Sequence, residues 1–193
     1  MKDFRVRRSD DKIVRIGGDV DFLGFSIRKY KNKKLLIKPS KENIKRFLRE
    51  IKEVIRKGTA LQTDKLIHAL NEKLTGWTNY YKSAVSSEVF SRIDHELFQA
   101  LKRWALKRHA RKGVRWCMRH YWKSHKGFNW RFYCMTKDKE GKKKILLLKR
   151  AKDTKIRRHV KIKASSNPFD PSYKDYFIKR ESKGNLVSTS VKY

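Results

Sequence analysis

Cationic side chains are concentrated near the expected C-terminal end of a helix, and the chemistry that they can carry is phosphate binding. Positive charges at a helix C-terminus offset the helix dipole, but about one or two such residues are enough for that purpose. This segment carries many more, so the surplus predicts contact with the phosphate groups of a polyanion. The candidate residues are Lys102, Arg103, Lys107, Arg108, His109, Arg111, Lys112 and Arg115.

Aromatic residues alternate with cations in the segment that follows, from Trp116 to Lys123. Such a mixture can stack on exposed nucleobases while it pairs with phosphates, and Arg119 is a further candidate for phosphate contact. We nevertheless expect packing in a small core to be the main role of four aromatic residues, Trp116, Trp122, Trp130 and Phe132. A third basic stretch, expected to form a strand or a short helix, contains Arg157, Arg158, His159, Lys161 and Lys163.

Cysteine and histidine do not occur in a pattern that would bind a metal ion. Cys117 and Cys134 are the only cysteines, too few and too far apart for a zinc knuckle, and the six histidines are scattered. The surrounding basic sequence is not that of a secreted, disulfide-linked domain. We therefore expect reduced thiols and no metal site.

The overall charge of the chain, like its basic segments, indicates a polyanionic partner. Among 193 residues, 52 Lys and Arg stand against 19 Asp and Glu, which leaves a net charge of +33, and 38% hydrophobic residues suffice for one or two small modules. Basic residues occur in nearly every segment, which favours a nucleic-acid partner. No stretch approaches the ~20 apolar residues of a spanning helix and no signal peptide opens the chain, so we expect a cytoplasmic protein without a membrane partner.

The elements that position these residues begin with a predicted β-hairpin. Residues 21–30 read DFLGFSIRKY, which favours a strand with apolar contacts on both sides. A basic turn at residues 31–34 leads into a return strand at residues 35–37. The two faces of the first strand would carry Phe22, Gly24 and Ser26 on one side and Leu23, Phe25 and Ile27 on the other.

Three amphipathic helices are predicted next and should form a compact bundle. Ser40 is the candidate N-cap of the first helix and Gly58 its stop, Thr63 can cap the second, and Ser86 or Ser87 the third. Apolar residues recur at the spacing of one helical face and are expected to form the core. These residues are Ile44, Phe47, Leu48, Ile51, Val54 and Ile55, then Leu66, Ile67, Leu70, Leu74, Trp77 and Tyr81, then Phe90, Ile93, Leu97, Leu101 and Trp104.

A smaller basic, aromatic-rich module with a second β-hairpin is expected to follow. Residues 128–134 predict one strand, 138–141 a turn and 145–148 the partner strand. NPFDP at residues 167–171 predicts a rigid turn, and the chain is expected to fray after Arg180. One face of the first strand would carry Phe128, Trp130, Phe132 and Cys134. The predicted fold class is α+β, with segments at residues 1–38, 39–112 and 113–180 and a disordered tail at 181–193.

Several motifs follow one another in a specific order. They are DFLGFSIRKY, LLIKPSKENIKRF, LIHALNEKLTGWTNYYKSAVSSEVFSRID, LKRWALKRH, a Trp-rich strand, IRRHVKIK and NPFDP. Each motif alone would be unspecific. Together, from about Asp21 to Arg180, they resemble the C-terminal half of group II intron-encoded reverse transcriptases.

This resemblance implies roles for two segments. Phe22, Leu23, Gly24 and Phe25 resemble the primer grip at the end of the polymerase palm, which in the family lies against the primer end. Residues 40–109 resemble the three-helix thumb, also called domain X or the maturase domain. In the family this domain contacts the template–primer duplex and the folded intron RNA.

The thumb-like segment also carries signature positions of the family. Gly76, Trp77, Asn79, Tyr80 and Tyr81 match its GW-NYY signature, and Asp94 matches an Ile-Asp step in the third helix. Packing is the expected role for these residues. Gly76 would let helices approach closely, and a half-buried Asp94 would need a hydrogen-bond donor nearby.

Departures from the family limit the expected activity. Polymerase chemistry needs carboxylates on a Tyr-Ala-Asp-Asp turn that hold two metal ions, whereas the only paired acids here, Asp10 and Asp11, lie in a polar segment. The Cys-Xaa-Xaa-Cys pairs of the HNH nuclease found in many relatives do not occur either. We therefore expect a protein that is not an enzyme by itself and has no cofactor, with Mg²⁺ arriving only with the RNA or with a palm-bearing partner.

Four functional interpretations stay open on the sequence alone. The preferred one is a maturase-type protein that binds structured group II intron RNA and promotes splicing. The second is a separately encoded thumb subunit that binds a template–primer duplex and completes a split reverse transcriptase with a palm-bearing chain. The third is a generic nucleic-acid-binding protein, and the fourth is a decayed fragment that folds without a function.

Overall fold

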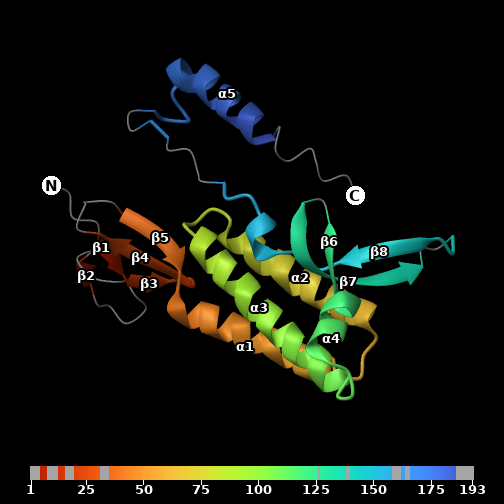
Figure 1. Ribbon diagram of the computed structural model, residues 1–193. Helices are drawn as coiled ribbons and strands as arrows, with labels where there is room; N and C mark the ends of the chain where they lie inside the picture. Colours follow the sequence, from red (N-terminus) through yellow and green to blue (C-terminus); the bar gives the residue numbers. More distant parts are fainter. Residues whose placement is uncertain are drawn as a thin grey trace. The chain divides into compact units, whose positions relative to one another are not determined.

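Two compact units make up the chain, residues 1–158 and residues 159–193. The computed structural model describes residues 5–7, 13–15, 20–30, 35–125, 127–137, 140–157, 162–163 and 166–185. In the first unit, helices lie between two three-stranded sheets, which confirms the predicted α+β class. These sheets lie at opposite ends of the helices (Figure 1). The segment boundaries expected at residues 38, 112 and 180 stay predictions.

The first three-stranded sheet corrects the strand predicted at residues 21–30. Leu23 and Gly24 both have positive φ angles, 47° and 78°, and Phe22 pairs with Phe25 across them. They form a two-residue hairpin turn, which requires left-handed backbone and favours glycine. The predicted alternation of faces across Gly24 is therefore wrong. The strands are β3 (Val20–Phe22), β4 (Phe25–Lys29) and β5 (Leu35–Pro39), and a separate pair is formed by β1 (Arg5–Arg7) and β2 (Ile13–Arg15).

The predicted three-helix bundle is present, and its caps follow the sequence in part. The Ser40 hydroxyl accepts a hydrogen bond from the Asn43 backbone N–H at 3.3 Å, and the Gly58 N–H donates to Val54 O at 2.8 Å. Thr63 is the first helical residue rather than the cap. Ser86 occupies the N-cap position, but its hydroxyl donates backwards to Tyr81 O at 2.8 Å. The helices are α1 (Lys41–Lys57), α2 (Thr63–Tyr81) and α3 (Ser87–Arg108).

The core of the bundle consists of the apolar stripes that the sequence predicts. All stripe members are buried except Val54 and Trp77, which are half-buried and pack against the others. Trp77 stacks on Phe47 with a centroid distance of 4.7 Å. Burying a large apolar side chain stabilises a fold by roughly 1.5–3 kcal/mol, so these stripes are the main source of the bundle's stability. Among the described helices, none combines the length and apolar composition needed to span a bilayer.

A fourth helix of this unit, α4 (Val114–Tyr121), was not anticipated from the sequence. It buries Cys117 and Tyr121 against α3, and the Cys117 thiol lies 3.8 Å from Ala105 O. Both cysteines are free thiols. Because α4 has only eight residues, its apolar positions give too short a pattern to separate a helix from the strand that follows.

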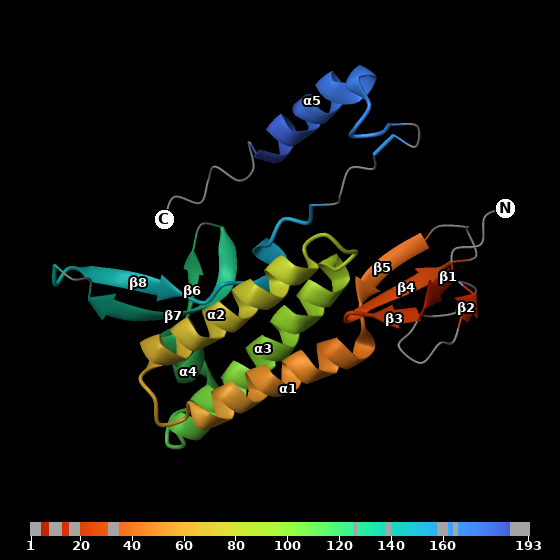
Figure 2. The same cartoon turned by 180° about the vertical axis from the view of Figure 1, so that it is seen from behind.

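The second three-stranded sheet contains the predicted hairpin and one further strand. Its pairing shifts between β6 and β7, where Lys123 pairs with Arg131 but His125 pairs with Phe128. Two residues of β7, Asn129 and Trp130, therefore stand opposite one residue of β6, which is a β-bulge. Figure 2 shows the hairpin of β7 and β8 projecting beyond the end of α2. The strands are β6 (Trp122–His125), β7 (Phe128–Lys137) and β8 (Lys143–Leu147).

This bulge overturns part of the predicted aromatic core. Trp122 and Phe132 are buried, as predicted, with 5% and 3% of their surface exposed. Trp130 is 60% exposed and Trp116 is 37% exposed, so the expectation that they pack in the core is wrong. The bulge breaks the alternation that would have placed Trp130 on the same face as Phe132, and α4 presents Trp116 on its outer side.

The second unit contains the predicted NPFDP turn and a helix. Asp170 N–H donates to Asn167 O at 3.1 Å, and the Asp170 carboxylate accepts from Ser172 N–H at 2.9 Å, which confirms the turn. A short 3₁₀ helix, η2 (Pro171–Tyr173), then leads into α5 (Lys174–Asn185). This helix continues past Arg180, where we expected the chain to fray. Residues 186–193 lie outside the described residues.

Candidate nucleic-acid interface

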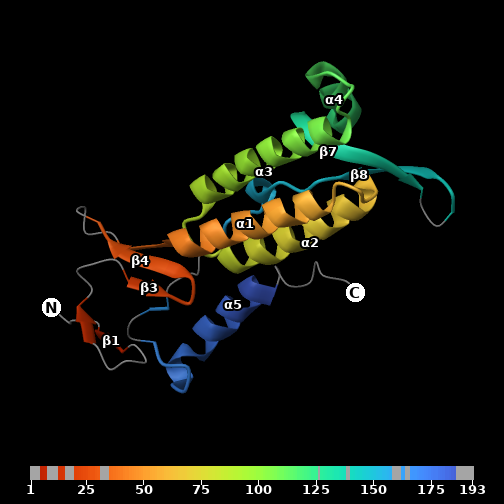
Figure 3. The ribbon, with the colours of Figure 1, turned by 90° about the horizontal axis from the view of Figure 1, so that it is seen from below.

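Helices α1 and α3 pack side by side (Figure 3), and cations from both helices line a cavity between them. Arg103 and Lys107, one helical turn apart on α3, line a shallow cavity of about 220 Å³ together with Arg56 from α1. Lys52 also lines it and forms an ion pair with Glu96 at 2.7 Å. The sequence indicated the α3 cations but not Arg56, because only the helix packing brings α1 to this place.

Further exposed cations lie at the junction of α3 and α4. The junction residues are Arg111, Lys112, Arg115 and Arg119. Arg115 and Arg119 lie one turn apart on α4, which gives their charges a common face. Neither these four residues nor Arg103 and Lys107 form an ion pair with any residue that the structure describes. An excess of unneutralised positive charge is what a polyanion requires.

Arg108, another predicted phosphate contact, is engaged inside the protein. Its guanidinium donates to the backbone oxygens of Thr59 at 3.2 Å and Leu61 at 2.5 Å. It also lies 5.2 Å from the ring centroid of Trp104. These contacts fasten the loop between α1 and α2 to the end of α3. A sequence cannot separate such a cation from an exposed neighbour, since its partners are backbone atoms far away in the chain.

His109 lies beside an aromatic cluster at the end of α3. Its Nε2 is 2.7 Å from the Tyr121 hydroxyl. Partial burial, followed by electrostatic interactions with His120, Arg108 and Lys112, lowers the pKa of His109 below its ordinary value of 6.5. The ring is therefore mainly uncharged at neutral pH, and an approaching phosphate would favour its protonation.

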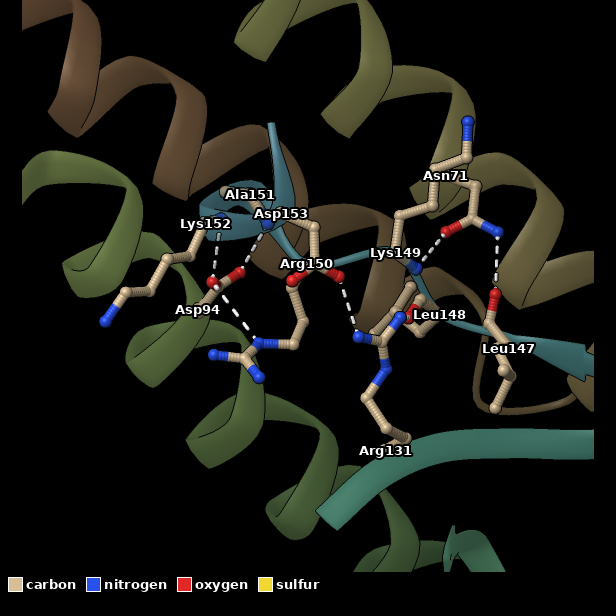
Figure 4. A network of polar contacts seen from close by, with 10 residues as sticks. All are labelled: Asn71, Asp94, Arg131, Leu147, Leu148, Lys149, Arg150, Ala151, Lys152 and Asp153. Carbon is tan, nitrogen blue, oxygen red and sulfur yellow. Dashed lines mark hydrogen bonds and ion pairs between the residues drawn. The ribbon is translucent and has the colours of Figure 1, made fainter. Parts of the chain in front are cut away.

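Asp94 of α3 fastens the segment after β8 to the bundle, as Figure 4 shows. Its carboxylate accepts the backbone N–H groups of Ala151 at 2.7 Å and Lys152 at 3.0 Å, and Arg150 Nε lies 3.9 Å away. The expectation that a half-buried Asp94 needs a nearby donor is confirmed. Burial raises the pKa of Asp94 above 3.8, and the backbone donors and Arg150 oppose that rise.

Asn71 of α2 holds the same segment from the other side. Its amide donates to Leu147 O at 3.1 Å and accepts from Lys149 N–H at 2.7 Å. Arg131 of β7 donates to the Asp153 carboxylate at 2.7 Å and to Leu148 O at 3.1 Å (Figure 4). The second sheet is thus attached to α2 and α3 by directed hydrogen bonds as well as by apolar packing.

The bundle with these cations matches a known protein family. Residues 44–122 match the family described as "Group II intron, maturase-specific domain". We refer to residues 44–122 by the name of the family that they match, as the maturase-specific domain. It runs from within α1 through α2, α3 and α4 to the start of β6, and it contains the junction cations. A search of curated proteins finds no match to the chain.

The primer-grip-like residues lie just outside the maturase-specific domain and are bonded to it. The Tyr80 hydroxyl donates to Leu23 O at 2.8 Å and the Tyr81 hydroxyl to Gly24 O at 3.1 Å. Phe25 lies against both tyrosine rings, with centroid distances of 5.1 and 5.0 Å. The φ angle of 78° favours glycine at position 24, and a Cβ atom there would also force the side-chain amide of Asn43 to move.

Gly76 of the maturase-specific domain does not mediate a close helix contact. It lies on the exposed side of α2, and a Cβ atom placed there would have no described atom within 4 Å. The expectation that Gly76 lets helices approach closely is therefore wrong.

The remaining predicted contacts lie C-terminal to the maturase-specific domain. Arg157 is exposed, and its backbone N–H donates to Lys82 O at 2.8 Å. Lys163 belongs to the second unit, where its Nζ lies 5.2 Å from the centroid of the Tyr176 ring. Arg158, His159 and Lys161 lie outside the described residues. Within the described part of the chain, no group of three or more His, Cys, Asp or Glu side chains could hold a metal ion.

Proposed function

We propose that this protein binds folded group II intron RNA and favours the spliceable fold, while the RNA and its Mg²⁺ ions carry out the bond-making chemistry. The observation that carries this proposal is the set of unneutralised cations on the maturase-specific domain, from Arg103 to Arg119. In this interpretation the protein acts without an active site of its own and works in the cytoplasm.

Phosphate contact is the physical basis of the proposal. A protein that neutralises phosphates releases the counterions condensed on the RNA, which supplies binding free energy without reading the sequence. The wide, shallow groove of an A-form helix exposes the phosphates and 2′-hydroxyls that an exposed cationic surface can reach. A protein that binds the spliceable fold better than competing folds shifts the RNA population towards it.

A binding and splicing experiment tests this function. The full chain would be titrated against a group II intron transcript and against a duplex RNA of equal length, between 50 and 200 mM salt. If ~6–10 phosphates are contacted, affinity should fall by ~10³–10⁵ over that range. The intron should also splice at a lower Mg²⁺ concentration with the protein present. A flat salt response would overturn the phosphate contacts, and equal affinity for both RNAs would favour a generic nucleic-acid-binding protein.

A second candidate function is that of a thumb subunit in a split reverse transcriptase. The first sheet favours it, because apolar residues there are exposed: Leu23 is 70% exposed, Leu35 54% and Ile37 43%. A palm-bearing chain that packs on this sheet would cover them. Reverse transcription that arises only when the two chains are mixed would establish this function. If the two chains form no complex when they are mixed, the thumb-subunit function is excluded.

A further inference from the structure

We propose that the cavity beside Trp130 binds one unstacked nucleobase of the RNA. This inference rests on the proposed RNA binding and assigns a task to a surface formed jointly by the matched segment and the strands that follow it. The cavity lies between α3 and the strands β6 and β7, and its volume is about 370 Å³. This volume falls within the ~300–1,000 Å³ of pockets that enclose small ligands.

Aromatic side chains form the walls of the cavity. Phe98 and Trp122 line it and contact each other edge to face, with a centroid distance of 5.6 Å. Phe132 lies 5.1 Å from Trp122 and continues the wall. These three side chains are packed, whereas Trp130, which also lines the cavity, is 60% exposed. An indole that stays open to solvent at the edge of an aromatic cavity offers a face for stacking.

Trp130 has a left-handed backbone conformation, which is unfavourable for a bulky residue and which positions its indole at the edge of the cavity. Trp130 has a φ angle of 60° and lies in the β-bulge opposite Ser124. Bulges re-aim side chains and are over-represented beside functional sites, and their left-handed position is usually glycine. A bulky residue with this φ angle costs stability and persists where the surroundings impose it, and such residues cluster at active sites, ligand clamps and switch regions. Packing does not explain the choice of tryptophan, since 60% of the residue's surface is exposed.

Polar groups in the wall favour a polar occupant over an apolar one. Arg131 lines the cavity, and its Nε is buried without a hydrogen-bond partner among the described residues. A buried donor of this kind is costly unless a ligand or water satisfies it. Lys149 and Arg150 also line the cavity, whereas both oxygens of its one carboxylate, Asp94, already accept backbone N–H groups. Arg131 is paired with Asp153, and Arg150 lies 3.9 Å from Asp94. Lys149, whose Nζ also donates to the Thr75 hydroxyl at 3.0 Å, adds one further positive charge beside the aromatic faces. This combination suits a base and a neighbouring phosphate.

A first experiment separates the structural role of Trp130 from binding. Trp130→Gly removes the ring and relieves the left-handed backbone, so the variant should be as stable as the wild type or more stable. Its affinity for an RNA hairpin with a single bulged uridine should fall about five- to 150-fold, the range for the loss of one stacked base. Trp130→Phe should retain most of the affinity. Met135→Ala, at another exposed position of β7, is the control and should change neither property. A marked loss of stability in Trp130→Gly would overturn the proposal, because the ring would then be a packing residue.

A second experiment locates the base and separates the two proposals. The bulged uridine would be replaced by 5-iodouridine, and the complex irradiated and mapped by mass spectrometry. Cross-links at Trp130 or Trp122 are expected, and cross-links confined to other regions would overturn the proposal. If the wild type binds the bulged and the fully paired hairpin equally, the base site is wrong while RNA binding stands. If it binds neither hairpin nor the intron transcript, both proposals fail.

Discussion

The carboxylate of Asp94 accepts the backbone N–H of Ala151 at 2.7 Å, across 57 positions of the sequence. This bond joins the third helix of the bundle to the chain that leaves the second sheet. Together with the Asn71 contacts, it fixes how that sheet sits on the bundle, and therefore also the cavity between α3 and β7.

Replacing Asp94 should loosen this attachment. Asp94→Ala leaves the N–H groups of Ala151 and Lys152 without their partner, which should lower the free energy of unfolding by about 1–3 kcal/mol. Urea denaturation followed by circular dichroism would measure the change. Glu96→Ala, also on α3, removes an exposed pair and is the control, with an expected loss of about 0–1 kcal/mol. Equal effects of the two substitutions would contradict the role given to Asp94.

Arg103 and Lys107 should contribute to RNA affinity through charge. In Arg103→Gln/Lys107→Gln, affinity for the intron transcript should decrease, and the slope of log affinity against log salt should become shallower by about 1.4–1.8 if each residue contacts one phosphate. Filter binding at several salt concentrations measures both quantities. Lys65→Gln/Lys73→Gln on α2 removes the same charge elsewhere and should change the slope less. An unchanged slope in the α3 variant would place the RNA on another surface.

Arg108 should behave differently from these neighbours. Arg108→Gln loses the hydrogen bonds to Thr59 O and Leu61 O and the contact with Trp104. Hydrogen bonds of a charged donor contribute about 1.5–3 kcal/mol, so a loss of unfolding free energy of roughly this size is expected in urea denaturation. The salt slope of RNA binding should stay near that of the wild type. A stable variant with a shallower slope would show that Arg108 contacts phosphate instead.

His109 should make stability depend on pH. Its pKa is below 6.5 in the folded protein, so the unfolded chain binds the proton more readily. The stability that neutral His109 contributes is present above pH 6.5 and is lost as the pH falls through the lowered folded pKa. Urea denaturation at several pH values between 8 and 5 should show a steeper decline for the wild type than for His109→Gln. Parallel curves would mean that His109 does not titrate abnormally.

Substitution of Gly76 should stabilise the protein, whereas substitution of Asp94 or Arg108 should destabilise it. Because a Cβ atom there meets nothing within 4 Å, Gly76→Ala should fit without strain. Alanine in place of glycine in a helix should raise the free energy of unfolding by about 0.5–1 kcal/mol. Thermal unfolding would measure the gain. If the variant is more stable but binds the intron transcript more weakly, the RNA backbone approaches α2 at this glycine.

The bundle could be predicted from the sequence because its signals are local. The spacing of residues such as Phe47, Ile51 and Leu70 identifies a buried helical face without knowledge of the neighbours. Ser40 and Gly58 likewise act on the helix that they border. The turn at Leu23 and Gly24 was missed because a continuous apolar run and a tight hairpin look alike until the backbone angles are known.

The candidate site could be predicted only in part because its geometry is tertiary. Because they are close in the sequence, Arg103 and Arg108 were both predicted to contact phosphate. Arg103 is exposed, whereas Arg108 binds the loop after α1. Arg103 and Arg56 are far apart in the sequence, yet they line the same cavity. Alternation placed Trp130 in the core, and one extra residue in β7 was enough to reverse that assignment.

The left-handed tryptophan has a consequence for laboratory evolution. Libraries randomised at codon 130 and challenged only by heat should become enriched in glycine or asparagine, which adopt this φ angle at little cost. Libraries selected for intron splicing in living cells should instead retain aromatic residues. The two sets of selected variants would then differ at residue 130, because thermal stability and splicing activity favour different amino acids there.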